Sequence, residues 1–123
     1  RKMEKGILKQ IHDCLTNDGF ETYFPSQKQG ECLEPYVVVK LDGTYNPLTV
    51  SSERPIYTIL VYVPENRYSI FETMIFNVKQ TLKKMYPTIM YIGNETPSYW
   101  DDNVKANMVS FQYYGCRKKE NFW

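Results

Sequence analysis

The sequence predicts an α+β protein in which a mostly antiparallel sheet of four to five strands carries two helices on one face. Two segments, 2–17 and 66–86, repeat apolar residues every three or four positions, as amphipathic helices do. Shorter apolar or alternating segments lie between and after them, as strands do. A length of 123 residues is typical of one domain, so we expect 1–123 to fold as a single unit.

The first predicted helix covers 2–17 and ends at the turn that contains Gly19, because glycine readily adopts the positive φ of a helix end. His12 falls on its polar side, where we interpret it as a solvated residue. The segment 20–24 (FETYF) alternates and is predicted as a short strand, and a polar loop, 26–31, follows. The apolar face of the helix comprises Met3, Ile7, Ile11, Cys14 and Leu15.

Two longer strands are predicted next. Segment 35–43 has a β-branched centre and ends at Asp-Gly, and segment 54–64 is apolar almost throughout. A strand with such a continuous apolar run is typically covered, at least in part, on both of its faces. The connection 43–53 is predicted as a long loop or arm, and loops of this length tend to be functional or mobile.

The second predicted helix covers 66–86 and is stopped by Pro87. Ser69 and Glu72 have the spacing of a capping box at its start. Lys83 and Lys84 suit the negative end of the helix dipole. We interpret its apolar stripe as core packing, and its members are Phe71, Met74, Ile75, Val78, Leu82 and Met85.

The last part of the chain is predicted as a strand at 88–93, a loop at 94–102 and a long strand at 103–114. The apolar alternation of the long strand changes phase between Met108 and Val109. Such a change indicates either a β-bulge or a strand that passes from one environment to another. Twelve residues span about 40 Å, so we expect one end to project toward a neighbour.

Charge and composition argue against a general nucleic-acid binder. Fifteen basic residues face fourteen acidic ones, so the net charge is +1. A local basic surface is still conceivable, formed by the second helix and the tail 117–123. The aromatic content is 15%, with eleven tyrosines, which suits a surface that meets another protein and is also common on sheets. The basic residues concerned are Lys79, Lys83, Lys84, Arg117, Lys118 and Lys119.

Three cysteines and one histidine do not match a zinc pattern, and we predict no metal or cofactor site. Free thiols indicate a reducing compartment such as the cytoplasm. The apolar runs are much shorter than a membrane span, and no signal peptide is recognised, so no membrane association is expected.

The adjacent acids Asp101 and Asp102 are the best candidates for chemistry, because metal-dependent nucleases hold their ligands near strand entrances. Neighbouring side chains of an extended segment point to opposite sides, so both could ligate one metal only across a bend. Lys105 lies three positions after Asp102, and residues three apart in a strand point to opposite faces of the sheet. We find no nucleophile–histidine pair, glycine-rich phosphate loop or HExxH motif. We therefore predict no enzyme and interpret the acids as solvated loop or interface charges.

Two segments carry a resemblance to a known family. The opening EKGILKQIHDCL with FETYFPS, and the closing PSYWDDNVKANMVSFQYYGCRKK, resemble small proteins of Gram-positive phages and prophages. Over nearly the whole chain, the order of elements resembles the tail terminator, or tail completion, proteins of long-tailed bacteriophages. The two segments that carry the resemblance contain no catalytic signature.

The resemblance implies a ring, typically a hexamer in the assembled tail, that caps the tail tube, stops its polymerisation and meets the head connector. A monomer is the alternative for the isolated chain before a partner is present. It implies the tail tube protein and the head–tail connector as partners, with DNA only passing through the lumen. It also implies assembly in the host bacterial cytoplasm and a place at the head-proximal end of the virion tail. Another neck component, such as a connector or a tube subunit, and a small nucleic-acid-binding or nuclease-like domain remain alternatives.

A head-to-tail ring needs two different patches on each subunit. Aromatic and arginine side chains usually carry interface energy, so we look for them in the loop 94–102, the arm 43–53 and the tail 117–123. Packing over the sheet edge is the alternative interpretation for Trp100. The candidate interface residues are Tyr45, Tyr99, Trp100, Asp101, Asp102, Lys105, Arg117, Lys118, Lys119 and Trp123.

Overall fold

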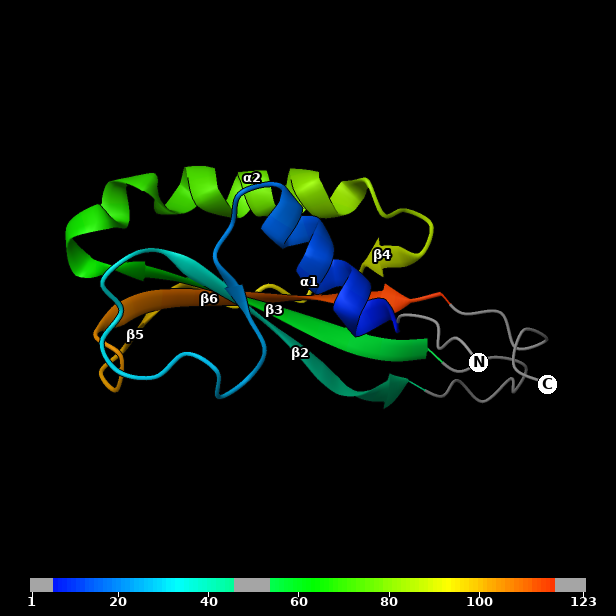
Figure 1. Ribbon diagram of the computed structural model, residues 1–123, viewed down its shortest axis with the longest axis horizontal. Coiled ribbons are helices and arrows are strands. Elements are labelled where there is room, and N and C mark those ends of the chain that lie inside the picture. The colour runs from blue at the N-terminus through cyan, green and yellow to red at the C-terminus, as the bar shows by residue number, and fades with distance from the viewer. Residues whose placement is uncertain (1–5, 46–53, 117–123) are drawn as a thin grey trace.

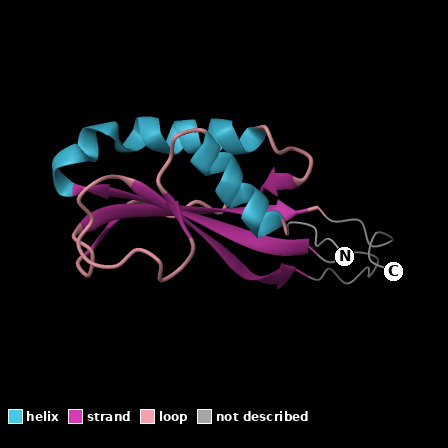
Figure 2. Cartoon of the chain, viewed as in Figure 1, coloured by secondary structure: helices cyan, strands magenta, loops and turns pink. Residues whose placement is uncertain are grey.

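The fold is α+β, as predicted, with a mostly antiparallel sheet and two helices that lie on the same face of it (Figures 1 and 2). The computed structural model describes residues 6–45 and 54–116. Within these ranges, no helix is long and apolar enough to cross a membrane. The elements are α1 (Ile7–Asn17), β1 (Thr22–Tyr23), β2 (Tyr36–Tyr45), β3 (Arg54–Pro64), a 3₁₀ helix (Glu65–Ile70), α2 (Phe71–Lys83), β4 (Ile89–Tyr91), β5 (Tyr99–Asp101) and β6 (Ala106–Gly115).

The sheet has six strands rather than four to five, because two short strands join it by pairing. The order is β1-β2-β3-β6-β4, and β5 pairs with the other end of β6. β1 runs parallel to β2, while all other pairs are antiparallel. β3 covers 54–64 as predicted and lies at the centre between β2 and β6. The three longest strands therefore form the body of the sheet.

Helix α1 buries its predicted apolar face against the sheet, with Ile7, Ile11 and Leu15 inside. Gly19 follows with φ of 97°, as expected for a residue after a helix end. The interpretation of His12 as a solvated residue is wrong. Its ring stacks on Phe24 with centroids 4.5 Å apart, and Nε2 lies 3.1 Å from the carbonyl oxygen of Thr22. The histidine is half-buried because β1 and the chain after it pass over its side of the helix.

Helix α2 packs through the predicted stripe, but its start differs from the prediction. Ser69 lies inside the 3₁₀ helix, and α2 begins at Phe71 after Ile70, which provides no side-chain cap. The capping box predicted for Ser69 and Glu72 is therefore absent. Phe71 is buried and contacts the Tyr68 ring, so core packing rather than a cap determines where the helix begins.

The change of phase in β6 marks a change of environment, because its pairing with β3 is continuous through Met108 and Val109. Val109 and Phe111 face the main core under the helices. Ala106 packs in a second small core on the opposite face, with Cys32 and Tyr36, where the segment between β1 and β2 covers one end of the sheet. The one register shift of the described sheet pairs lies in β2, between Leu41 and Thr44.

Candidate functional site

The acidic pair lies at the end of a β-hairpin rather than at the entrance of a long strand. The predicted loop 94–102 contains β5, which pairs with β6 so that Tyr99 faces Met108 and Asp101 faces Ala106. The strand predicted from 103 starts at Ala106, because the residues before it form the hairpin turn. The alternation of polar and apolar residues, which predicted the strand, does not distinguish this turn from the strand that follows it.

The two acids have separate hydrogen-bond partners in this turn. Asp101 Oδ1 accepts a hydrogen bond from the backbone N–H of Asn103 at 3.0 Å, as in an Asx turn. Asp102 Oδ1 accepts from Lys105 Nζ at 3.1 Å and from Trp100 Nε1 at 3.3 Å. These bonds, first that of Lys105, lower the pKa of Asp102. The arrangement stabilises the turn and keeps a charge at its tip.

The hairpin is held against the body of the protein. The backbone N–H of Cys32 donates to the carbonyl oxygen of Val104 at 2.7 Å, and Val104 packs against the second core. Lys105 has φ of 57°, a left-handed conformation that returns the chain into β6. The tip is therefore a fixed projection of the sheet.

Aromatic and apolar side chains are exposed around this tip. The exposed fractions are 50% for Tyr99, 42% for Trp100 and 70% for Leu33 from the neighbouring segment. A cavity of about 310 Å³ lies beside Trp100 and Leu33. We call the group Leu33, Tyr99, Trp100, Asp101 and Asp102 the hairpin surface.

The remaining predicted interface residues are not part of the hairpin surface. Lys105 lies next to the hairpin surface, and its side chain forms an ion pair with Asp102. Tyr45 is the last residue of β2, and its side chain lies outside the described part of the structure. The loop or arm predicted at 43–53 begins later than expected, because 43–45 belong to β2 and pair with the start of β3. Residues 46–53 and the tail 117–123, including Arg117, Lys118, Lys119 and Trp123, lie outside the described part of the structure.

A second exposed apolar surface, which the sequence did not reveal, is a groove of about 500 Å³ between α2 and the edge strand β4. Phe76 and Tyr86 are 58% and 65% exposed, and Met90 and Tyr91 are 37% and 46% exposed. We call this surface the groove, and its lining includes Phe76, Lys79, Lys83, Tyr86, Met90 and Tyr91.

Two lysines line the groove, and none of the lining residues within 6–45 and 54–116 is acidic. Lys79 pairs with Glu95, and its Nζ lies 5.1 Å from the centroid of the Tyr91 ring. Within the described ranges, Lys83 makes no ion pair. The groove thus combines aromatic surface with one available positive charge.

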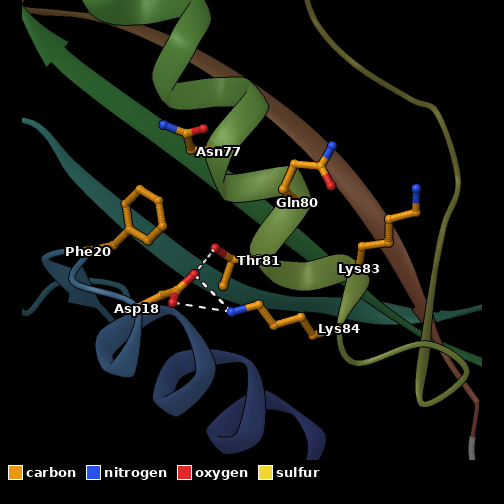
Figure 3. Close-up of a pocket in the computed structure, with 7 residues that line it drawn as sticks. All are labelled: Asp18, Phe20, Asn77, Gln80, Thr81, Lys83 and Lys84. Atoms are coloured by element: carbon orange, nitrogen blue, oxygen red, sulfur yellow. Dashed lines mark hydrogen bonds and ion pairs between the residues drawn. The ribbon is translucent and has the colours of Figure 1, made fainter.

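A separate polar pocket of about 680 Å³ lies where α1 ends beside α2 (Figure 3). Asp18 accepts a hydrogen bond from Thr81 Oγ1 and forms an ion pair with Lys84 Nζ at 3.2 Å. Both contacts lower the pKa of Asp18, and the hydrogen bond from Thr81 contributes most. Lys83 extends away from this cluster. Because the charges of Asp18 and Lys84 satisfy each other, we interpret this pocket as a link between the helices.

The basic surface expected on α2 is partly neutralised, since Lys79 and Lys84 pair with Glu95 and Asp18. No group of three or more histidine, cysteine, aspartate or glutamate side chains among residues 6–45 and 54–116 is placed to hold a metal ion. The three cysteines, Cys14, Cys32 and Cys116, are free thiols.

Sequence reasoning missed the groove because its residues come from a helix, a turn and a strand. One local signal existed, since Phe76 lies off the core stripe of α2 and shares a second stripe with Lys79 and Lys83. The hairpin surface was located in part, since Tyr99, Trp100, Asp101 and Asp102 were named as candidates. No protein-family model matches the chain, and no curated protein matches it.

Proposed function

We propose that this chain is a non-enzymatic assembly protein of a long-tailed bacteriophage or prophage. In this role it caps the tail tube as a ring, ends tube polymerisation and joins the tube to the head connector. It acts in the cytoplasm of the host bacterium during assembly and remains at the head-proximal end of the virion tail. The resemblance of its first and last segments to tail terminator proteins supports this proposal.

One structural observation carries the proposal furthest: two different exposed aromatic surfaces lie at opposite ends of one edge of the sheet. The hairpin surface includes β5, and the groove borders β4 (Figure 1). Subunits of a ring contact one another head to tail through two unlike patches, and this molecule presents two. Aromatic residues are the side chains that such interfaces favour.

The acids Asp101 and Asp102 fit an interface better than a metal site. Each already has a partner in the hairpin turn, and Asp102 is paired with a lysine rather than with further acids. A carboxylate beside an exposed tryptophan can select a partner by charge while the ring contributes apolar contact.

The decisive experiment is tail assembly in the phage or prophage that encodes this chain, with and without the protein. Negative-stain images report tail length and the presence of heads. We expect overlong or headless tails without the protein and normal ones when it is added back. Tails of normal length that lack heads would assign the chain to the head–tail connector role instead. Normal virions without the protein would contradict the proposed function.

A further inference from the structure

We propose that the hairpin surface of one copy of this chain docks into the groove of the next copy. The inference rests on the proposed ring function, because a ring supplies the repeated contact between identical subunits. It goes further by naming the two surfaces and the residues that meet. The occupant of the groove is thus a second copy of the chain.

The positions of the two surfaces allow a head-to-tail contact but no contact within one copy. β5 pairs with the start of β6, at Met108, and β4 pairs with its end, at Gly115. Seven residues of a strand separate these points by about 23 Å. A fixed hairpin therefore cannot reach the groove of its own chain. Two unlike patches on one rigid body generate rings or open chains of subunits.

The two surfaces are complementary in chemistry. The hairpin surface offers two rings that are about half exposed: Trp100, beside the carboxylate of Asp102, and Tyr99, on the other face of β5 together with Asp101. The groove offers aromatic walls with lysines at positions 79 and 83. Lys83 has no ion pair within the described part of the chain, and the Asp102 side chain is 78% exposed. Because a carboxylate can accept several hydrogen bonds, Asp102 can keep Lys105 and still pair with Lys83 of another copy.

The opposite edge of the sheet is less suited to this contact. β2 carries an ion pair between Lys40 and Asp42, 3.5 Å apart, on its outer part, and its register shifts between Leu41 and Thr44. Charges and irregular register are features that discourage strand edges from pairing with other chains. The β4 edge instead adjoins exposed Met90 and Tyr91.

The test uses two variants that each damage one surface. Trp100→Asp places a third acid on the hairpin surface, and Phe76→Asp places an acid in the groove. Both side chains are exposed, so we expect both variants to fold, as checked by circular dichroism. Because both changes add negative charge, the two damaged surfaces repel and cannot rescue each other. Leu41→Ala, an exposed apolar residue on the β2 edge, is the matched control.

Sedimentation velocity at protein concentrations up to about 1 mM measures association. We expect the wild type and Leu41→Ala to form oligomers, and each single variant to bind itself at least about tenfold more weakly. An equal mixture of the two variants should form dimers of 14.6 kDa chains and nothing larger, because it contains one intact hairpin and one intact groove per pair. The mixture result is specific to a head-to-tail contact.

Two results would overturn the inference. One is a wild type that stays monomeric at about 1 mM, and the other is a mixture that associates no better than its components. Either result leaves the proposed function open to its own test, tail length in the absence of the protein. Conversely, the expected dimers together with normal virions in that assay would support the contact and reject the tail function.

Discussion

The indole Nε1 of Trp100 donates a hydrogen bond to Oδ1 of Asp102 across 3.3 Å, and Lys105 Nζ donates to the same oxygen. The acid that first indicated a metal site therefore holds an exposed aromatic ring at the tip of a hairpin. The lysine lowers the pKa of the carboxylate, which favours its charged form. An aromatic ring and a fixed charge beside each other are recognition features.

Replacing Trp100 with alanine should remove tail termination while leaving the fold intact. The side chain is exposed and donates its hydrogen bond to Asp102 in the neighbouring turn, so the free energy of unfolding should change by no more than about 0.5 kcal/mol. Tail length by negative stain and urea unfolding measure the two effects. Leu41→Ala, which changes an exposed apolar residue on the other edge, should leave both unchanged. A large loss of stability for Trp100→Ala would show that the ring packs on the sheet edge.

Replacing Gly115 with alanine should destabilise the protein through overpacking. A Cβ there would lie 2.9 Å from Pro55 Cγ and from Tyr57 Cε2, and 3.2 Å from Ile7 Cδ1. Such overpacking costs about 1–3 kcal/mol, measured by urea unfolding. Gly6→Ala is the control, because its Cβ would meet nothing within 4 Å. Equal stabilities of the two variants would contradict this close packing at the end of β6.

Asp42 should make the protein less stable in acid. Its carboxylate accepts hydrogen bonds from Thr58 Oγ1 at 2.6 Å and Gln112 Nε2 at 3.3 Å, and the bond from Thr58 is the main cause of its lowered pKa. Since the pKa is lower in the folded state, the unfolded state binds more protons, and stability rises with pH. The contribution is present above about pH 4 and is lost as pH falls through the folded-state pKa.

The measurement compares urea unfolding of the wild type and Asp42→Asn over a pH series. At about pH 7 the variant should be less stable by up to about 1 kcal/mol, because the carboxylate is partly exposed and screened. The difference should shrink toward zero at about pH 2. Glu72→Gln, on the exposed side of α2, is the control for replacing a surface carboxylate by an amide. A difference that is constant with pH would show that the hydrogen bonds of Asp42 do not depend on its charge.

Cys32 should react with a thiol reagent far more slowly than Cys116. Its side chain is buried, with 2% exposed, and burial raises the pKa of its thiol. Since the thiolate is the reactive species, we expect at least about tenfold slower labelling at neutral pH. Single-cysteine variants with serine at the other two positions allow the comparison. Fast labelling of Cys32 would show that the segment over the second core opens readily.

The helical faces and the central strand were predictable because their signals are local. Ile7, Ile11 and Leu15 recur at helical spacing, and all three are buried. The continuous apolar run of β3 predicted its bounds, and Ile59, Val61 and Val63 of this strand are buried in the main core. The start of α2 was not predictable from Ser69 and Glu72, because tertiary packing of Phe71 outweighs a weak capping preference.

The candidate site was predictable only in part. Trp100 and Asp102 drew attention by residue type, but the hairpin that presents them depends on three residues of β5 pairing with β6. A strand of that length has no periodicity of its own. The groove was missed because Phe76 and Tyr91 become neighbours only when α2 and β4 are placed beside each other.

The residues of the main core follow from the sequence alone, because apolar spacing along a helix or strand sets the buried face without reference to the rest of the chain. What lies on the surface depended on how the elements pack together. The packing formed a second core around Ala106, turned the acidic pair into a hairpin tip and joined distant aromatic residues into a groove. The physical reason is that exposure depends on which segments cover a residue, and those covering segments are distant in the chain.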